Sequence, residues 1–414
     1  MNFKYGCIGE KLKHSFSKEI HNSLADYDYA IIEIAREEFE KFATEKKFNA
    51  VNVTIPYKEM IIPYLYEIDS RAKEIGAVNT VVNRGGKLYG YNTDFYGMSE
   101  LIKRIGIDLR DKKVAILGTG GTSKTSLAVA KSMGAREIIR VSRTARENSV
   151  TYEELYENHT DTDVIINTTP SGMYPNIFDI PVDLSLFPSL SGVADAVYNP
   201  LRTPLILAAK KRGIAAEGGL YMLVAQAVRA SEIFIDKKYN TEETDKVFKK
   251  IYSEKENIVL TGMPASGKST VGRLIADAMG REFIDTDDII CEDERKSIPD
   301  IFRENGEKYF RDAETRAVKR VASLCGKVIA TGGGAILREE NVDALRENGK
   351  LYFIDRPLAD IIPTSDRPLA SDREAIEKRY NERYAIYNST ADVKINANSD
   401  AEGVKVRIME DFLK

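Results

Sequence analysis

One glycine-rich segment restricts the fold of this chain more than any other stretch. Residues 262–269 read GMPASGKS and fit the pattern G-x-x-x-x-G-K-[ST]. The apolar run 258–261 before it is strand-like, and residues 270–279 after it suit a helix. In this setting backbone N–H groups cradle phosphates, the lysine reaches the transferred phosphate, and the hydroxyl coordinates Mg²⁺. The segment predicts an ATP site formed by Gly262, Ser266, Gly267, Lys268, Ser269 and Thr270, with Ser269 as a metal ligand.

The composition argues against several classes of protein. The chain has 414 residues, which suggests two or three domains, and it balances 60 Lys and Arg against 64 Asp and Glu. The net charge of −4 argues against a dedicated nucleic-acid binder. The three cysteines, Cys7, Cys291 and Cys325, are far apart and predict neither a zinc motif nor a disulfide framework. No apolar run approaches the ~20 residues of a membrane span, so we expect a cytoplasmic monomer or homodimer without membrane or nucleic-acid partners.

A second glycine-rich turn, at residues 118–121, lies between an apolar strand-like run and a helical pattern. Gly118, Gly120 and Gly121 suit a dinucleotide, because glycine allows the pyrophosphate to approach the backbone at a helix N-terminus. An NAD site needs an acidic residue after the next strand, but Arg143 and Arg146 stand there. Cations suit a 2′-phosphate, so NADP is favoured, and a solvated basic loop is the weaker alternative.

Strand-like runs alternate with helical patterns along most of the chain, which is typical of parallel sheets covered by helices. A charged stretch at 235–257 reads as an exposed terminal helix followed by a short connector near 253–256. We expect an α/β chain of three parts. They are a substrate-binding lobe (1–100 plus about 221–252), a Rossmann-like NADP-binding lobe (101–220), and a P-loop α/β/α domain with a central parallel sheet (257–414).

Four clusters of polar residues occur within the first hundred positions, and together they indicate a hydroxyl-rich ligand. They are Lys13–Ser17, Asn52–Lys58, Gly76–Thr80 and Gly90–Asp94. Each cluster alone also suits a cap or a turn. Lys58 could donate a proton or a hydrogen bond to an oxygen that gains negative charge, with the carboxylate of Asp94 holding the ammonium group in place.

The first half closely resembles shikimate dehydrogenase from about residue 4 to residue 251. The segments that carry the resemblance are YGCIGEKLKHSFSKEIHN, AVNVTIPYK, IGAVNT, GYNTDFYG, LGTGGTSK, VSRT, INTTPSGM, DAVYNP and GGLYMLVAQA. The resemblance implies that Ser15 and Ser17 hold the substrate carboxylate, that Thr54, Asn79, Asp94, Tyr198 and Gln226 contact ring hydroxyls or close the pocket, and that Lys58 and Asp94 form the catalytic pair. It also implies that the backbone at Gly219 lies beside the nicotinamide. The family usually holds NADP with an Asn-Arg-Thr turn, and this chain has Ser142-Arg143-Thr144 instead.

The second half carries further polar groups at expected strand ends. Asp285 and Asp287 follow the second strand of this half, and Gly332, Gly333 and Gly334 follow a later one, at the edge where a parallel sheet binds ligands. Arg311 precedes this triple glycine along the chain. Residues 361–369, which contain Arg367, suggest a mobile lid, and Arg383 follows on a helix.

This half closely resembles shikimate kinase from about residue 257 to residue 414. The segments are GMPASGKST, FIDTDDII, GEKYFRDAE, TGGGA, DRPLA and ERYAIY. The resemblance implies that Asp285 holds Mg²⁺ through water. It implies that Asp287 accepts hydrogen bonds from shikimate hydroxyls, including the hydroxyl that attacks the phosphate. Arg311 and Arg383 would clamp the shikimate carboxylate. The triple glycine would line the substrate, and Arg367 would reach the phosphates. The lid lacks the arginine that the family often places against adenine.

The two resemblances predict a bifunctional enzyme of the shikimate pathway, in which NADPH reduces 3-dehydroshikimate and ATP with Mg²⁺ phosphorylates the product. Two alternatives remain. The first is a quinate/shikimate dehydrogenase fused to a small-acid kinase of different specificity. The second is a chain in which one half is degenerate and regulatory. The second alternative predicts loss of catalytic residues, yet Lys58, Asp94, Lys268 and Asp287 are all present.

Overall fold

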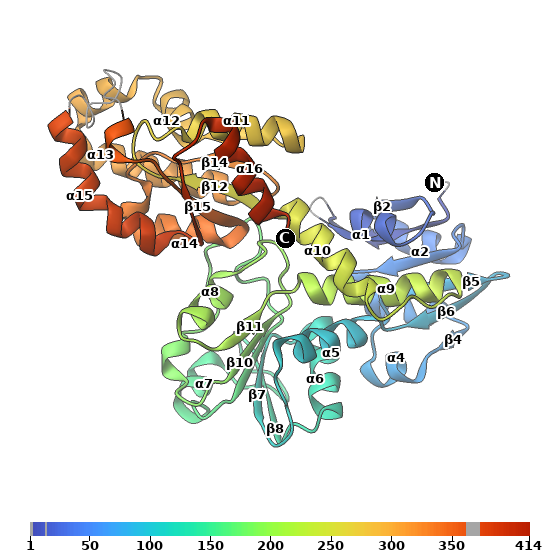
Figure 1. Cartoon of the computed structure of the whole chain (residues 1–414). Coiled ribbons are helices and arrows are strands. Elements are labelled where there is room, and N and C mark those ends of the chain that lie inside the picture. The colour runs from blue at the N-terminus through green and yellow to red at the C-terminus, as the bar shows by residue number, and fades with distance from the viewer. Residues whose placement is uncertain (1–2, 13–14, 362–372) are drawn as a thin grey trace. The chain divides into compact units, whose positions relative to one another are not determined.

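The computed structural model describes residues 3–12, 15–361 and 373–414. The described chain forms two compact units, unit 1 (Met1–Ile251) and unit 2 (Tyr252–Lys414), and each is described by itself (Figure 1). Unit 1 contains a six-stranded and a five-stranded sheet, and unit 2 contains one five-stranded sheet. This is the α/β architecture that the alternation of strand and helix patterns predicts.

The first lobe of unit 1 is built on the sheet β2-β1-β3-β5-β6-β4. Its strands are β1 (Tyr5–Gly9), β2 (Tyr29–Glu33), β3 (Ala50–Val53), β4 (Glu67–Ile68), β5 (Thr80–Arg84) and β6 (Lys87–Tyr91), and its helices are α1 (Ser17–Leu24), α2 (Arg36–Glu45), α3 (Tyr57–Met60), η1 (Ile62–Tyr64) and α4 (Ser70–Ile75). β5 is antiparallel to both β3 and β6. The chain segments that follow β3 and β6 therefore leave the sheet at the same edge.

The second lobe of unit 1 is a fully parallel sheet in the order β11-β10-β9-β7-β8. Its strands are β7 (Lys113–Leu117), β8 (Glu137–Val141), β9 (Val164–Asn167), β10 (Gly192–Asp195) and β11 (Ala215–Glu217). Its other elements are α6 (Gly121–Ser132), α7 (Tyr152–Asn158), η2 (Leu184–Leu186) and α8 (Pro204–Lys211). Every residue of β7 is buried, because helices cover both faces of the sheet. The order changes direction at β7, which places the following glycine turn at a typical ligand-binding crevice.

Two long helices, α5 (Asp94–Ile105) and α9 (Leu220–Ile235), pack against each other in unit 1 (Figure 1). α9 returns the chain from the second lobe to the first. Ala230 and Phe234 of α9 lie in the same core cluster as Cys7 and Tyr29 of the first lobe. Buried apolar contacts therefore attach α9 to the first lobe.

The segment after α9 differs from the expectation of an exposed helix and a connector. α10 (Glu243–Lys255) buries Val247, Phe248 and Ile251, so it is amphipathic rather than fully exposed. The helix also continues through the expected connector at 253–256 as far as Lys255, and β12 begins at Asn257. The many charged residues of this stretch belong to its outer face, which composition alone could not separate from the inner face.

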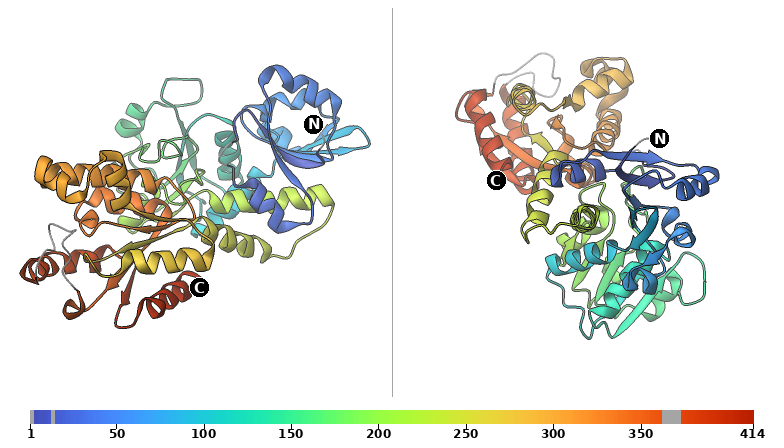
Figure 2. Two further views of the ribbon diagram at one scale, coloured as in Figure 1. Left: turned by 90° about the horizontal axis from the view of Figure 1, so that it is seen from above. Right: turned by 90° about the vertical axis from the view of Figure 1, so that its right-hand side faces the viewer.

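Unit 2 is a parallel sheet in the order β13-β14-β12-β15-β16, with helices on both faces (Figure 2). Its strands are β12 (Asn257–Thr261), β13 (Phe283–Asp285), β14 (Val328–Ala330), β15 (Gly349–Asp355) and β16 (Val393–Asn396). Its helices are α11 (Lys268–Met279), α12 (Thr286–Glu294), α13 (Ile298–Ala322), η3 (Ala335–Leu337), α14 (Glu339–Asn348), η4 (Leu358–Asp360), α15 (Arg373–Thr390) and α16 (Ala401–Phe412). Alternate residues of β12 enter different cores, since Ile258 and Leu260 pack towards α11 and α16 whereas Val259 packs towards α13 and α14.

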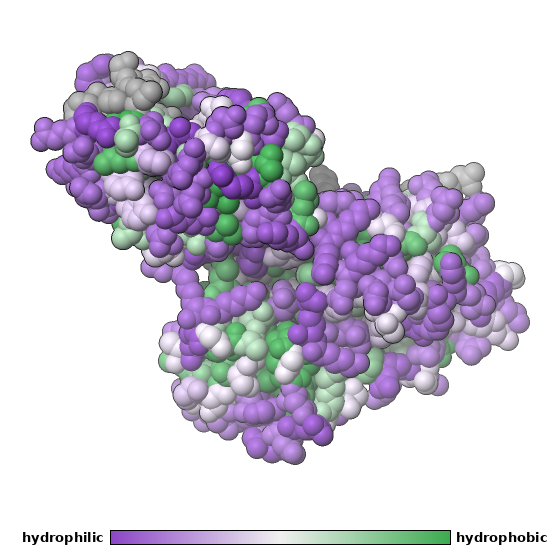
Figure 3. Space-filling view, in the orientation of Figure 1, coloured by the Kyte–Doolittle hydropathy of each residue, from purple (hydrophilic) through white to green (hydrophobic). Residues whose placement is uncertain are grey.

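Hydrophilic residues cover most of the face of each unit that Figure 3 shows. Within the part of the chain that the structure describes, no helix combines the length and the apolar character that crossing a membrane requires.

Candidate functional site

A lysine–aspartate ion pair lies where the first lobe meets α5. Lys58 Nζ lies 2.6 Å from Asp94 Oδ2, and the two side chains are 14% and 10% exposed. Lys58 lies on α3, which follows β3, and Asp94 is the first residue of α5, which follows β6. The sheet thus brings together two residues that are 36 positions apart. A partly buried ammonium held in this way is suited to stabilise a developing negative charge on a ligand oxygen.

Asn79, Thr93 and Gln226 form a hydrogen-bonded group directly before Asp94 in the fold. The backbone N–H of Thr93 donates to Asn79 Oδ1 at 2.7 Å, and Asn79 Nδ2 donates to Thr93 Oγ1 at 3.1 Å. Thr93 Oγ1 in turn donates to Gln226 Oε1 at 3.3 Å, which connects the group to α9. Two of these residues were expected at the site. Thr93 was not, although its position beside Asp94 in the segment GYNTDFYG was a usable signal.

Three hydroxyl groups gather near the start of α1. Ser15 Oγ donates to Ser17 Oγ at 3.0 Å, and the hydroxyl of Tyr198 is hydrogen-bonded to Ser15. The ring of Phe16 packs edge-on against the ring of Tyr198, with centroids 5.3 Å apart. Burial raises the pKa of Tyr198 to about 12, so its hydroxyl stays protonated. Thr54, which follows β3 directly, is half-buried.

The glycine turn after β7 lies against the side chain of Lys58. A Cβ placed on Gly121 would lie 3.6 Å from Lys58 Cδ, so the N-terminus of α6 and the ion pair face the same space. Gly118 has φ +107°, a left-handed conformation that favours glycine, and Gly120 has open space around it. The turn can therefore accept a pyrophosphate on its backbone.

Basic side chains surround this turn. Arg140 Nη2 donates to Thr119 O at 3.2 Å, and Arg146 Nη1 donates to Thr119 Oγ1 at 3.4 Å. The exposed Arg143 lies between them in sequence, on a turn closed by hydrogen bonds between Ser142 Oγ and the backbone of Thr144. Arg140 was not expected here. The cations fit a ligand that carries a phosphate beyond the pyrophosphate.

Gly219 precedes α9 and packs so tightly that a Cβ would overlap the carbonyl oxygen of Ala196. Only glycine fits at this position without movement of the loop after β10. The position predicted to lie beside the nicotinamide is therefore held by direct backbone packing.

The phosphate-binding loop of unit 2 joins β12 to α11. Gly262 and Gly267 have φ values of +145° and +94°, which shape the loop. Lys268 Nζ donates to the carbonyl oxygens of Gly262 and Met263, each at 2.9 Å. The hydroxyl of Ser266 is buried without a hydrogen-bond partner among the described residues, and Thr270 is exposed. The loop thus has the form expected of a phosphate cradle.

Ser269 and Asp285 provide hard oxygen atoms beside this loop. Ser269 Oγ donates to Asp285 Oδ2 at 2.7 Å, and Asp285 Oδ1 accepts the backbone N–H of Asp287 at 3.1 Å. A hydroxyl and a carboxylate are ligands that Mg²⁺ prefers. Among the described residues, no group of three or more His, Cys, Asp and Glu side chains could hold a metal alone. The donor set therefore fits a magnesium ion whose remaining ligands are phosphate oxygens and water.

Charged side chains gather against the triple glycine that follows β14. A Cβ on Gly332 would lie 2.7 Å from both Asp287 Oδ1 and Glu314 Oε1, and a Cβ on Gly334 would overlap the guanidinium of Arg311. Arg311 Nη1 lies 2.7 Å from Glu314 Oε2. Burial raises the pKa of Glu314, although Arg311 and Arg383 act in the opposite direction. Glu314 was missed from the sequence, where it reads only as one more charged residue of a long helix.

Two residues of α15 also contact the triple glycine. Arg383 Nη1 donates to Gly333 O at 3.0 Å, and the hydroxyl of Tyr387 donates to the same oxygen. Arg383 is 3% exposed. The structure thus brings Asp287, Arg311 and Arg383 together at the triple glycine. Arg367 lies at 362–372, outside the described residues.

Arg356, which follows β15 directly, was also missed. Its Nε donates to Ser266 O at 3.1 Å, and its Nη2 would lie 3.6 Å from a Cβ on Gly267. This guanidinium lies on the phosphate loop at a strand end, and the sequence pattern gave no reason to single it out.

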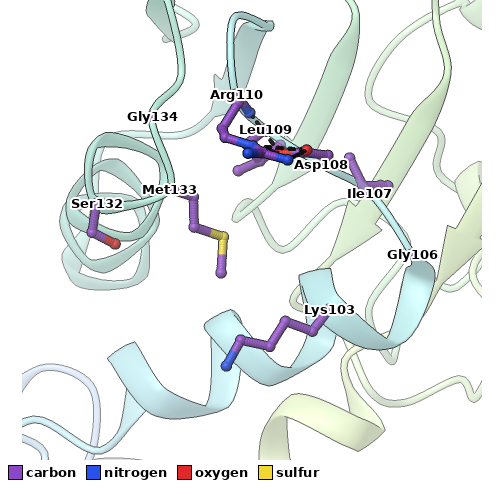
Figure 4. Close-up of a pocket in the computed structure, with 9 residues that line it drawn as sticks. All are labelled: Lys103, Gly106, Ile107, Asp108, Leu109, Arg110, Ser132, Met133 and Gly134. Atoms are coloured by element: carbon purple, nitrogen blue, oxygen red, sulfur yellow. Dashed lines mark hydrogen bonds and ion pairs between the residues drawn. The ribbon is translucent and has the colours of Figure 1, made fainter.

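A pocket of about 600 Å³ opens elsewhere on the second lobe (Figure 4). It is lined by Lys103, Gly106, Ile107, Asp108, Leu109, Arg110, Ser132, Met133 and Gly134. Lys103 is paired with Glu100, and Arg110 is paired with Asp108. The pocket lies at the edge where β7 begins, opposite the glycine turn where β7 ends, so it is separate from the ion pair.

The fold and the two sites define a class of protein. Unit 1 is a two-lobed α/β protein with a dinucleotide-type turn facing a lysine–aspartate pair, as in oxidoreductases. Unit 2 has the sheet order and phosphate loop of a small kinase.

Comparisons with known proteins refine this class. Residues 7–81 match the family model "Shikimate dehydrogenase substrate binding domain", and residues 264–413 match the model "Shikimate kinase". The chain is 39% identical over 247 residues to "Shikimate dehydrogenase (NADP(+))" of Clostridium beijerinckii, which covers 56% of this chain and 91% of the relative. This chain is also 37% identical in sequence to shikimate dehydrogenase 1 from Peptoclostridium difficile, whose crystal structure matches with a TM-score of 0.56. The match covers 61% of this chain and 98% of the chain in that crystal structure.

A further structure, a chorismate mutase/shikimate 5-dehydrogenase fusion protein from Clostridium acetobutylicum, is 33% identical with a TM-score of 0.57, over 61% of this chain and 97% of that chain. The chain therefore belongs to the shikimate dehydrogenase family and carries in addition a shikimate kinase domain. It is a bifunctional enzyme of the shikimate pathway.

Proposed function

We propose that unit 1 reduces 3-dehydroshikimate to shikimate with NADPH, and that unit 2 phosphorylates shikimate to shikimate 3-phosphate with ATP and Mg²⁺. One observation carries the proposal: in each unit, polar groups suited to a small hydroxylated acid lie beside a nucleotide-type loop. In unit 1 this is the approach of Gly121 to Lys58, and in unit 2 it is the meeting of Arg311 and Arg383 at the triple glycine.

In unit 1, the proposed roles follow from the positions of the polar groups. Ser15 and Ser17 hold the substrate carboxylate, while Thr54, Asn79, Tyr198 and Gln226 contact ring oxygens or close the pocket. NADPH, when bound, supplies the hydride that adds to the ketone carbon. Lys58 donates to the ketone oxygen as negative charge develops there, and Asp94 holds the ammonium in position at 2.6 Å.

The cofactor preference rests on charge. Gly118, Gly120 and Gly121 receive the pyrophosphate at the N-terminus of α6, and Gly219 lies beside the nicotinamide. Arg143, on the turn that Ser142 and Thr144 close, and Arg146, just beyond it, would bind the 2′-phosphate that distinguishes NADP from NAD.

In unit 2, the proposed roles divide between phosphate and substrate. Gly262, Ser266, Gly267, Lys268 and Thr270 bind the phosphates, and Ser269 and Asp285 hold Mg²⁺, which shields the negative charge of the phosphates. Asp287 accepts the proton of the attacking hydroxyl. Arg311 and Arg383 hold the carboxylate over Gly332, Gly333 and Gly334, and Arg367 completes the charge stabilisation.

The proposal also assigns a role to each part of the chain. The first lobe with α9 and α10 binds substrate, the second lobe binds NADP(H), and unit 2 is the kinase.

One experiment tests both activities. The full chain is given 3-dehydroshikimate, NADPH, ATP and Mg²⁺, and products are followed by mass spectrometry with each component omitted in turn. We expect shikimate 3-phosphate with all components present, and shikimate without ATP. Separate reactions compare quinate with shikimate, both as a substrate for oxidation by unit 1 and as a substrate for phosphorylation by unit 2. Phosphorylation or oxidation of quinate at equal or higher kcat/KM would contradict the proposed specificity.

A further inference from the structure

A continuous line of buried hydrogen bonds runs from β2 to the proposed substrate pocket of unit 1. The hydroxyl of Tyr29 donates to Asn52 Oδ1 at 2.7 Å, and Asn52 Nδ2 donates to Thr80 Oγ1 at 3.1 Å. Thr80 Oγ1 donates to Asn79 Oδ1 at 3.1 Å. Tyr29 and Thr80 are fully buried, and the ring of His21 stacks on Tyr29 with centroids 4.0 Å apart. The line therefore starts from a side chain that packing holds in place.

The hydrogen-bond partners along this line restrict where each proton can lie. The carbonyl oxygen of Asn79 can only accept, and it lies 3.4 Å from Asn52 Nδ2. The amide of Asn52 therefore presents its NH₂ group to Thr80 and its oxygen to the hydroxyl of Tyr29. Thr80 has a single hydroxyl proton, and it accepts from Asn52, so that proton is free to go to Asn79 or to Thr93, whose Oγ1 also lies 3.1 Å away. The direction of donation runs from Tyr29 towards the pocket.

Asn79 receives a second constraint from the backbone. The N–H of Thr93 can only donate, and it meets Asn79 Oδ1 at 2.7 Å. When the Thr80 hydroxyl also donates to Asn79, both lone pairs of Asn79 Oδ1 are used. Asn79 Nδ2 gives one proton to Thr93 Oγ1 and keeps one more. The remaining capacity of the Asn79 amide is therefore that of a donor, and the ligand atom that meets it must be an acceptor, such as a ketone or hydroxyl oxygen.

We propose that Thr80 and Asn52 are positioning residues of the dehydrogenase site, which fix the amide of Asn79 so that it presents an N–H to the ligand. This inference rests on the proposed role of Asn79 in substrate binding. The same contacts hold the backbone at Thr93, directly before Asp94. Neither Thr80 nor Asn52 has to touch the ligand, because each acts through Asn79.

Thr80→Val tests the relay, because valine keeps the shape of threonine and removes the hydroxyl. We expect kcat/KM for 3-dehydroshikimate to fall about 5- to 10-fold, mainly through KM, the loss typical of one hydrogen bond. The KM for NADPH and the kinase activity should stay unchanged, and Thr80→Ser should restore activity. The matched control is Thr162→Val, which removes a fully buried hydroxyl that donates to His159 O at 2.7 Å in the second lobe.

A double-mutant cycle separates positioning from loss of stability. If Thr80 acts through Asn79, Thr80→Val should cost less than 2-fold in an Asn79→Ala background, because the amide it positions is gone. An undiminished loss in that background would overturn the proposal, as would wild-type kinetics in Thr80→Val. If that variant does not fold, Tyr29→Phe removes the first donor of the line. Tyr29→Phe should raise the KM for 3-dehydroshikimate, and an unchanged KM for this substrate would overturn the proposal.

A second readout does not depend on the reaction. Hydrogen exchange of the Thr93 amide, whose proton goes to Asn79, should be faster in Thr80→Val than in wild type and unchanged in Thr162→Val. Wild-type chain without activity on 3-dehydroshikimate would refute the proposed function, and the exchange result would still decide the relay. Equal exchange in all three proteins would overturn the relay.

Discussion

Ser269 Oγ and Asp285 Oδ2 lie 2.7 Å apart, so the two residues proposed as magnesium ligands already face each other across the end of β13. The hydrogen bond holds the two oxygen atoms next to each other at the start of α11, directly after the phosphate loop. A site organised in this way needs little rearrangement when the metal binds.

Removal of one of these oxygens should therefore affect the metal specifically. We expect Asp285→Asn to raise the Mg²⁺ concentration for half-maximal kinase activity by at least ~10-fold, since an amide is a weaker ligand than a carboxylate. A Mg²⁺ titration of the kinase rate measures this. EDTA should abolish kinase activity of the wild type and leave NADPH-dependent reduction intact. An unchanged Mg²⁺ requirement in the variant would remove Asp285 from the metal site.

Lys58→Ala tests the proposed catalytic pair. We expect kcat for reduction to fall ~10²–10³-fold with a smaller change in KM, because the ammonium acts on charge that develops in the transition state. Steady-state kinetics with 3-dehydroshikimate measure both constants. Kinase activity of the same preparation is the control for folding of unit 2. A reductase within a few-fold of wild type would show that Lys58 has no catalytic role.

Arg143→Ala tests the cofactor preference. Loss of a charge-assisted hydrogen bond to the 2′-phosphate should raise the KM for NADPH about 10-fold and leave the weaker use of NADH unchanged. Arg136→Ala, at the opposite end of β8, is the matched control and should change neither value. Equal losses with both cofactors would indicate that Arg143 only supports the fold.

Arg311→Lys tests substrate anchoring in the kinase. Arg311 lies against Gly334 and pairs with Glu314 and Glu307, so lysine would keep the charge and lose the planar fork. We expect the KM for shikimate to rise about 10-fold and the KM for ATP to change little. Arg316→Lys, an exposed position paired with Glu294, is the control. A rise confined to the KM for ATP would place Arg311 on the nucleotide side.

Glu347→Gln should stabilise unit 2 at high pH. Glu347 is 2% exposed, and its Oε2 has no hydrogen-bond partner among the described residues. Burial, with a contribution from Asp343, raises the pKa of Glu347 to about 9 from 4.5. The folded state therefore holds a proton that the unfolded state releases, and wild-type stability falls by up to about 1.4 kcal/mol per pH unit between these values.

Glutamine removes this dependence, so the advantage of the variant should grow from pH 6 to pH 8. Urea unfolding of the full chain at both pH values checks this. Glu340→Gln, on the exposed side of the same helix, should show no such trend. An advantage that stays constant between the two pH values would show that Glu347 is ionised in the folded state.

The sequence predicted the parallel sheets and both nucleotide loops well, because strand, glycine turn and helix are local patterns. It also named Lys58 and Asp94, although only the antiparallel pairing around β5 shows how they meet. Glu314 and Arg356 escaped prediction for a different reason. Glu314 reaches the site through its contact with Gly332, and Arg356 through its contact with Gly267. Both glycines are distant in sequence, so no local pattern indicates these contacts.

The charged stretch before β12 was misjudged because average composition does not show which face of a helix is buried. Val247 and Ile251 lie four positions apart and share the inner face of α10. Their spacing was readable, but the surrounding lysines and glutamates concealed it.

α10 also determines how the two activities can be studied apart. Its middle belongs to unit 1, where Arg104 pairs with Asp245 and covers the ring of Phe248. Its end belongs to unit 2. There the guanidinium of Arg281 donates to the carbonyl oxygens of Ser253 and Glu256, and the N–H of Gly326 donates to the carbonyl oxygen of Lys255. A protease site, a tag or a truncation placed within α10 would therefore disrupt a helical turn whose contacts belong to one unit or the other. Point inactivation of a single site within the intact polypeptide is thus the cleaner way to assign each rate to its own half.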